Sequence, residues 1–406
     1  MTSTILAHVG ISSANSYAAA GTDFRLDTAL LAEMCAEYVI GTRTEWREAV
    51  EQHPDPGSLG ASAEQHGVLP LLARALSEAG IAGSAVRQRA REIAFRNLAL
   101  TAALVKLTGS LRERGIRFLA YKGPVLAQQL YGDPTLRQFR DLDILVAPSD
   151  VLRTAEALRQ LGYRDIEPFS PALLRRHVAS QCEWPMRSPH GTVIELHWAL
   201  FPRYGSFDLG FDELSRASVG IALAGEPVRA PCVGHLALVL SAHGTKHFWY
   251  RLGWLVDFAL VMRNHADGDV DRLLGDAAAR GMRRILLASA ALTKTVLKIK
   301  LTKTFESAIE ADPGVGKLAD HLRQSLFSGT SPEDLLTENI WFLRSRERWS
   351  DRAKIISRLA STPGPEEWRI AKLPEWAGWV YRPLRVARAA RYIPRIAKRA
   401  LSFSKP

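Results

Sequence analysis

FLAYKGPVLAQQLYGDPTLRQFRDLDILV, the stretch Phe118–Val146, ends in two acids inside a short apolar run. Asp141 and Asp143 are one residue apart, and on an extended strand residues i and i+2 project from the same face. Two neighbouring carboxylates repel each other unless a cation lies between them, and their hard oxygen atoms suit Mg²⁺. The pair therefore predicts a metal site, with two solvated acids at a strand end as the alternative.

The residues just before the acids add the parts of a phosphate-binding site. Lys122 and Gly123 separate a predicted strand from a predicted short helix. Glycine lets the backbone approach a ligand closely, and a helix that begins after it offers free N–H groups to phosphate. Arg137 and Arg140 follow, immediately before the two acids. Together these residues favour binding of a nucleoside triphosphate and its metal ion.

This segment resembles the nucleotidyltransferase superfamily, and more closely a bacterial family of nucleotidyltransferases with the pattern L-K-G-x-x-L…Y-x-x-P-x-x-R…D-x-D-x-L-V. The matching residues are Lys122, Gly123, Leu126, Tyr131, Pro134, Arg137, Asp141, Asp143, Leu145 and Val146. The resemblance continues through Glu195–Trp198 and His243–Asp257 and would cover Asp27–Arg263. Most superfamily members have Gly-Ser at the phosphate-binding turn, whereas this chain has Gly123-Pro124. The serine contact is therefore absent, and the preceding lysine would replace part of it.

The resemblance implies metal-dependent transfer of a nucleoside monophosphate from a nucleoside triphosphate to a hydroxyl acceptor, with release of pyrophosphate. The superfamily uses a third carboxylate from a neighbouring strand, and Glu195 on a predicted strand would join Asp141 and Asp143 around Mg²⁺ or Mn²⁺. The alternative is that Glu195 faces solvent on an edge strand. Basic side chains would offset the charge of the phosphates. The nucleotide-binding residues expected on this basis are Lys122, Gly123, Arg137, Arg140, Lys246 and His247.

Two histidines four residues apart offer a second interpretation of one helix. His243 and His247 would share a helix face, and such a pair can bind Zn²⁺. The glutamate that follows the first histidine in the zincin motif is absent, because Gly244 occupies that position. We therefore expect His247 and Lys246 to line the cleft near the phosphates or the acceptor, with a packed helix and satisfied histidines as the open alternative.

Composition narrows the class of protein. The chain has 406 residues, enough for two or three domains, and its three cysteines are too few and too widely spaced for a disulfide framework. The N-terminal residues lack the basic and apolar regions of a signal peptide. No apolar run approaches the roughly 20 residues that a membrane-spanning helix needs. We expect a cytoplasmic protein.

The net charge of +11 is concentrated at the C-terminus, where Arg382–Pro406 contains eight basic residues and no acid. Apolar residues fall between these cations, which predicts a basic amphipathic helix interrupted at Pro394. Such a tail is suited to contact an anionic membrane surface, nucleic acid or an acidic peptide. A solvated terminal helix with its cations facing outward is the open alternative.

The predicted fold class is α+β, with a small mixed β-sheet nucleotidyltransferase core flanked by N-terminal and C-terminal helical regions. The longest predicted helix is Ala85–Glu113, and one further strand is predicted at Gly220–Pro231. The Trp-rich segment is expected to form a small helical subdomain with buried tryptophans. The expected regions are 1–26 (poorly ordered), 27–114 (helical), 115–232 (catalytic core), 233–330 (helical, completing the cleft), 331–380 (Trp-rich and helical) and 381–406 (basic tail).

Other functions remain open at this point. D-x-D also holds Mn²⁺ against a nucleotide sugar in glycosyltransferases, although Lys122 and Glu195 have no evident role in that scheme. A non-catalytic nucleotide-binding regulatory protein is the second alternative, because the phosphate-binding serine is missing. The acceptor is unidentified: a peptide natural product or a sugar is the first guess, and nucleic acid is not excluded.

Overall fold

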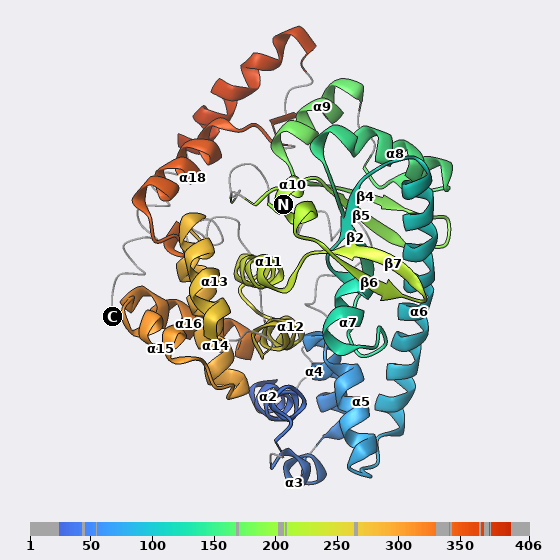
Figure 1. The fold of residues 1–406 in the computed structure, drawn as a ribbon, viewed down its shortest axis with the longest axis vertical. Coiled ribbons are helices and arrows are strands. Elements are labelled where there is room, and N and C mark those ends of the chain that lie inside the picture. Colours follow the sequence, from blue (N-terminus) through green and yellow to red (C-terminus); the bar gives the residue numbers. More distant parts are fainter. Residues whose placement is uncertain are drawn as a thin grey trace.

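The computed structural model describes residues 24–42, 45–53, 55–167, 170–201, 207, 209–263, 267–329, 341, 343–364, 367–368, 373 and 375–390. Helices flank a five-stranded mixed sheet and a separate two-stranded sheet (Figure 1). The predicted α+β class, a small mixed sheet with helical regions before and after it, is confirmed.

The larger sheet consists of β1 (Phe118–Ala120), β2 (Asp141–Val146), β3 (Arg164–Asp165), β4 (Glu183–Arg187) and β5 (Val193–His197). Its strand order is β1-β2-β5-β4-β3. β2 and β5 pair in parallel, whereas the other neighbouring strands are antiparallel. A parallel pair needs a crossover connection, which here contains α8 (Val151–Gln160) and α9 (Pro171–Ser180).

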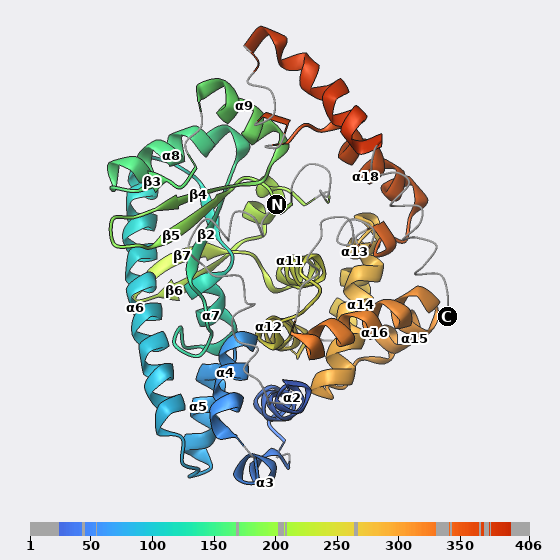
Figure 2. The same ribbon diagram turned by 180° about the vertical axis from the view of Figure 1, so that it is seen from behind.

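One face of this sheet is apolar and packs against helices. Alternation along β2 sends Leu142, Ile144 and Val146 to this face, where all three are buried. They share a hydrophobic core with α8 and with the long helix α6 (Ser84–Glu113). Figure 2 shows α6 running alongside the strands. Because this face is filled by apolar side chains, the polar residues of β2 project from the other face.

The sequence predicts one further strand at residues 220–231; the segment does form β-structure, but with two strands rather than one. The segment forms a hairpin of two strands, β6 (Val219–Leu223) and β7 (Glu226–Ala230). Its turn consists of Ala224 and Gly225, which both have positive φ, as a two-residue turn of the primed type requires. Alanine rarely adopts this conformation, so the sequence carries no clear signal for the turn.

The N-terminal and C-terminal helical regions form one body. α2 (Phe24–Ile40) contacts α12 (Leu252–Arg263) and α14 (Arg283–Leu297), and residues of both regions lie in the same hydrophobic core. Residues 24–26, which the sequence assigns to a poorly ordered N-terminus, belong to α2. Residues 1–23 lie outside the described residues.

The remaining helices are α3 (Trp46–Glu51), α4 (Pro56–His66), α5 (Leu69–Glu78), α7 (Gly123–Tyr131), η1 (Pro148–Asp150), α10 (Phe211–Arg216), α11 (Val233–Lys246), α13 (Asp267–Ala279), α15 (Lys303–Glu310), α16 (Pro313–Ser328), α18 (Trp349–Ser361) and η3 (Glu375–Val380). Residues 381–390 are also helical. In the described parts of the chain, every helix is too short or too polar to cross a membrane.

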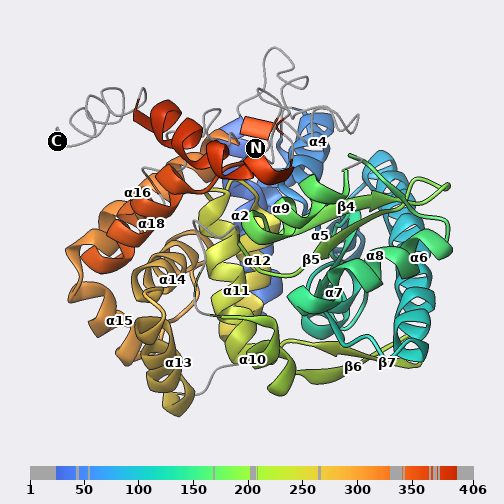
Figure 3. The same ribbon diagram turned by 90° about the horizontal axis from the view of Figure 1, so that it is seen from above.

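The Trp-rich segment is less buried than the sequence predicts. Trp341 and Trp368 are buried, but Trp349, Trp376 and Trp379 are between 69% and 82% exposed. The reason is that α18 lies on the surface and buries one residue, Ile355. The C-terminal helices, by which we mean α18, η3 and the helix at residues 381–390, lie beside α9 (Figure 3).

Part of the predicted basic tail contacts the body of the protein. Arg385 and Arg388 both lie within ion-pair distance of Glu367, which is fully buried. These two cations therefore face the protein rather than solvent. Residues 391–406 lie outside the described residues, so the contact of the tail with an anionic surface stays a prediction.

α11 and α12 are joined by a tight connection that folds back onto α11. Phe248 and Trp249 have φ of 56° and 52°, in the left-handed region, and both are buried. The backbone N–H of Trp249 donates to the carbonyl of Gly244 at 2.8 Å. A Cβ added at Gly244 would lie 2.3 Å from Cε2 of the indole, so only glycine fits beside this ring.

We predict that Gly244→Ala lowers the free energy of unfolding by about 1–3 kcal/mol, because the indole must shift within a filled core. Urea denaturation measures this change. The control is Gly275→Ala in α13, where an added Cβ meets nothing within 4 Å. It should leave stability unchanged or raise it by up to about 1 kcal/mol. Equal unfolding midpoints for the two variants would contradict the prediction.

Candidate active site

The pairing of β2 with β5 brings the predicted acids together. Asp143 lies directly opposite Glu195, and Asp141 lies opposite Val193. Residues opposite each other share a face of the sheet, so the three carboxylates project from the same face. His197 also projects from this face, opposite Leu145. The site is therefore built on two adjacent strands rather than on loops.

Lys122 binds one of these acids directly. It precedes α7 in an extended conformation, and its Nζ donates to Oδ1 of Asp143 at 2.9 Å. The side chain of Asp143 is only 2% exposed, so its charge needs a partner of opposite sign. The next residue, Gly123, has φ of +56°, and an added Cβ would lie 3.2 Å from the carbonyl oxygen of Asp141. Gly123 therefore allows α7 to begin close against β2.

The two acids of the D-x-D motif differ in their electrostatic environment. Burial alone would raise the pKa of Asp143, but Lys122 and His197 hold that pKa well below its ordinary value. At Asp141 burial, reinforced by the charges of Asp143 and Glu195, raises the pKa to about 7. Asp143 is therefore ionised, whereas Asp141 carries a proton for part of the time at neutral pH.

His197 is the centre of the acidic cluster. Its Nε2 lies 3.3 Å from Oδ1 of Asp143 and 3.3 Å from Oε2 of Glu195, and its Nδ1 lies 3.8 Å from Oε2 of Glu183. Burial alone would lower its pKa, but the close approach of Asp143 and of the other nearby acids raises that pKa well above the ordinary value. The imidazole therefore offsets part of the negative charge on this face.

The C-terminal end of α11 lies close to the carboxylates. The charge of Lys246 is near enough to help hold the pKa of Glu183 below its ordinary value, against the effect of burial. Burial, followed by the charges of Lys122 and Lys246, lowers the pKa of His247 well below its ordinary value. His247 is neutral, and its ring centroid lies 5.4 Å from that of Trp254.

The zinc interpretation of the histidine pair gains no support from the structure. The rings of His243 and His247 meet edge to face, with centroids 4.8 Å apart. Within the described residues, neither belongs to a group of three side chains that could hold a metal ion. The position of the diagnostic zincin glutamate is Gly244, which has no room for a side chain.

The two predicted arginines are held by other partners. Arg137 forms an ion pair with Asp257 of α12, in which Nη2 lies 2.9 Å from Oδ2. The hydroxyl of Tyr131 donates to the same carboxylate at 2.8 Å. Arg140 is 47% exposed and lies 3.8 Å from Glu64 of α4. The binding of nucleotide by Arg137 and Arg140 stays a prediction. In the structure, Arg137 links the segment that leads into β2 to α12.

The sequence interpretation assigned no role to Glu183 or His197. The signal for His197 is present, because strand alternation places it on the same face as Glu195. Glu183 is harder to find, since it begins β4, a strand that contains Pro185. A proline within a stretch of sequence argues against a central strand, so the sequence of β4 gives no clear strand signal.

The profile of the family described as "Uncharacterised nucleotidyltransferase" matches residues 52–298, which is more than half of the chain. No curated protein matches.

Three solved structures show a distant likeness. The solution structure of the antibiotic-resistance factor ANT(2'')-Ia has 14% sequence identity and a TM-score of 0.34, covering 45% of this chain and 94% of that chain. The crystal structure of ANT(2'')-Ia with adenylyl-2''-tobramycin has 13% identity and a TM-score of 0.32, covering 45% and 98%. An antigenic nucleotidyltransferase-like protein from Paracoccidioides brasiliensis has 14% identity and a TM-score of 0.29, covering 52% and 97%. Likeness at this level carries no argument about the site.

We predict that Asp257→Ala lowers the free energy of unfolding by about 3–5 kcal/mol, because it leaves the buried guanidinium of Arg137 without its partner. Chemical denaturation measures the loss. The control is Asp212→Ala, which breaks a pair with Arg117 whose side chains are 74% and 64% exposed. That change should cost less than about 1 kcal/mol. Losses of equal size would show that the Arg137–Asp257 pair does not join the two elements.

A second prediction concerns the two acids of the motif in protein stripped of divalent ions. Because the pKa of Asp141 is raised, the folded state binds this proton more tightly than the unfolded state, and stability falls as pH rises from about 4 to 7. Asp141→Asn should therefore stabilise the protein by about 1–3 kcal/mol at pH 8, with the gain disappearing near pH 4.

Asp143→Asn is the matched control and should have the opposite sign. The pKa of Asp143 is lowered, so its charge stabilises the folded state above the ordinary carboxyl pKa, and removing it should destabilise the protein at pH 8. Thermal unfolding over this pH range measures both variants. Shifts of the same sign at pH 8 would refute the assignment of a proton to Asp141.

Proposed function

Because the chain belongs to the uncharacterised nucleotidyltransferase family, we propose that it moves a nucleoside monophosphate from a nucleoside triphosphate to a hydroxyl acceptor and releases pyrophosphate. The observation that carries this proposal is the register of β2 and β5, which sets Asp143 opposite Glu195 with Asp141 on the same face. Lys122 and Lys246 supply positive charge beside these acids. Family membership favours this chemistry over the transfer of a sugar by a D-x-D glycosyltransferase.

The residues on this face fit a divalent metal ion. Asp143, Glu195 and His197 each offer a ligand atom, and these atoms all lie within 4.8 Å of one another. Both ring nitrogens of His197 are buried and make no well-aligned hydrogen bond with described residues. Asp141, Asp143 and Glu195 are the proposed ligands of Mg²⁺ or Mn²⁺, and His197 would become a fourth ligand only on losing its ring proton. A bound ion would lower the pKa of the acceptor hydroxyl and offset charge on the triphosphate.

The basic residues of this site have two roles in the proposal. Lys122 holds the Asp143 carboxylate in place through its hydrogen bond, and it lies at the start of α7. Lys246 is the last residue of α11. Both ammonium groups would offset the negative charge that develops on the phosphates during transfer. Gly123 would let phosphate approach the free N–H groups at the beginning of α7.

The test uses the full-length chain with each α-labelled nucleoside triphosphate and Mg²⁺ or Mn²⁺. We expect release of pyrophosphate and transfer of label to an acceptor in cell extract. Asp141→Asn, Asp143→Asn and Glu195→Gln should each lower the rate by about a hundredfold or more, since each removes a proposed ligand. Glu226→Gln, on the exposed hairpin strand β7, is the control and should retain the rate.

The fraction of extract that takes up the label decides the class of acceptor. Label in a peptide or sugar agrees with the first expectation, whereas label in nucleic acid would identify a tailing activity instead. Metal-dependent binding of nucleotide without pyrophosphate release or transfer in any extract would favour the non-catalytic alternative. Turnover that survives all three substitutions would contradict the proposed site.

A further inference from the structure

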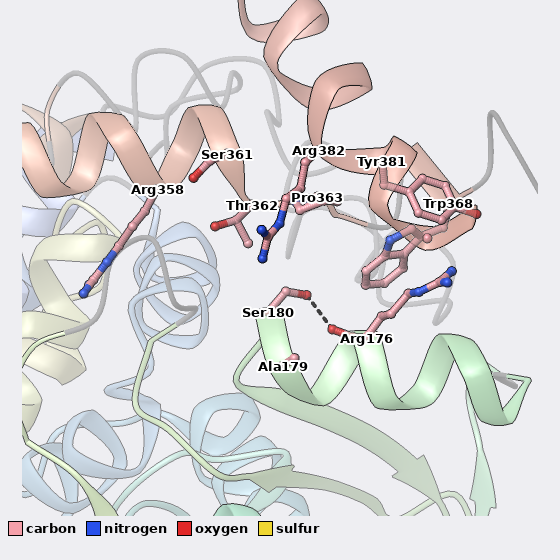
Figure 4. A pocket seen from close by; sticks show the side chains of 11 residues that line it. Arg176, Ala179, Ser180, Arg358, Ser361, Thr362, Pro363, Trp368, Tyr381 and Arg382 are labelled. Atoms are coloured by element: carbon pink, nitrogen blue, oxygen red, sulfur yellow. Dashed lines mark hydrogen bonds between the residues drawn. The ribbon is translucent and has the colours of Figure 1, made fainter. Parts of the chain in front are cut away.

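A pocket of about 390 Å³ lies between α9 and the C-terminal helices, apart from the acidic face of the sheet. Figure 4 shows its two walls: Arg176 and Ser180 come from α9, whereas Arg382 and Trp368 come from the C-terminal segment. The volume is within the range of about 300–1,000 Å³ that is usual for small-molecule sites. Its lining differs in charge from the acidic face.

The lining is basic and rich in hydroxyl groups. Three guanidinium groups belong to it, and none of the described lining residues is acidic. Arg382 is exposed and makes no hydrogen bond or ion pair with any described residue. Its guanidinium extends between Thr362 and Ser180 (Figure 4). Arginine and hydroxyl donors without an acid among them are suited to an anion, and the planar fork of arginine matches phosphate.

A second, independent observation points to a ligand. Trp368 is only 6% exposed, and its Nε1 is buried with no hydrogen-bond partner among the described residues. This N–H faces the pocket (Figure 4). A buried donor without an acceptor is unfavourable, and a ligand oxygen in the pocket would supply the missing acceptor. Beside it, Tyr381 contributes a second aromatic ring to the lining.

From this geometry we infer that the pocket binds a phosphate monoester of a small molecule that carries a ring. The phosphate oxygens would accept hydrogen bonds from Arg382, from Thr362 and from the indole N–H of Trp368. The ring would pack against Pro363 and the accessible edge of Trp368, because the ring faces of Trp368 and Tyr381 are themselves buried. This site is separate from the acidic face, so the inference does not depend on the transfer reaction proposed above.

The pocket is nevertheless close to the acidic face along the chain. Ser180 lines the pocket, and Glu183 follows three residues later, so their Cα atoms are at most about 11 Å apart. His177 joins the two places: its Nε2 lies 2.8 Å from the carbonyl oxygen of Glu183, and its ring centroid lies 6.4 Å from that of Trp368. A ligand that binds Trp368 would therefore also affect the position of Glu183 at the start of β4, through His177.

Calorimetric titration of the full-length chain tests the inference, with phenyl phosphate and inorganic phosphate as probes and EDTA present to remove divalent ions. We expect phenyl phosphate to bind more tightly than inorganic phosphate because of its ring. Arg382→Met should weaken phenyl phosphate about tenfold or more through loss of a charged donor. Trp368→Phe keeps a ring but removes the N–H, and should weaken both probes by about threefold to tenfold.

Arg229→Met is the matched control, because Arg229 is an exposed arginine on β7 away from the pocket. It should bind both probes within about twofold of the parent protein. Circular dichroism and thermal unfolding of each variant without probe confirm that the fold is retained. The parent protein, but not Arg382→Met, should gain thermal stability when phenyl phosphate is added.

Three results would overturn the inference. The first is that the parent protein shows no binding of phenyl phosphate even at about 10 mM, because a built site should have a dissociation constant below this concentration. The second is unchanged binding by Arg382→Met. The third is binding that Lys122→Met abolishes and Arg382→Met leaves intact, because the anion would then occupy the acidic face of the sheet.

Discussion

The hydrogen-bonded ion pair between Lys122 and Asp143 is the contact on which the arrangement of the site depends. Four acids and one imidazole gather on one face of the sheet, and Asp143 is almost completely buried among them. Charges of one sign in such a place are tolerated only when a cation compensates them. Lys122 supplies that cation from the residue just before α7, so the same contact holds the turn between β1 and α7 against β2.

The central part of the fold could be predicted from the sequence because its patterns are local. The apolar run around Asp141 and Asp143 identifies β2, and the alternation around Glu195 identifies the strand that lies next to it. The resemblance to nucleotidyltransferases added the expectation that these strands are neighbours. The position of Lys122 just before a helix is equally local, since Gly123 and Pro124 mark where α7 begins.

The parts that could not be predicted depend on contacts between distant residues. The partner of Arg137 is Asp257, and no local pattern shows that these two charges meet. The approach of Glu183 to His197 likewise results from the pairing of β4 with β5, which Pro185 obscures. The exposure of Trp376 and Trp379 depends on what lies above the C-terminal helices, and composition does not contain that information.

Of the two walls of the pocket between α9 and the C-terminal helices, one lies inside the segment that matches the family and the other lies outside it. α9 lies inside the segment that the family profile matches, residues 52–298, whereas α18 and the helix at residues 381–390 lie beyond it. The acidic face of the sheet is wholly inside the matched segment. The proposed metal ligands therefore lie in the segment that matches the family, whereas one wall of the proposed recognition pocket lies in a C-terminal piece beyond that segment. Exchange of that piece during evolution would change the small molecule recognised without altering the acids.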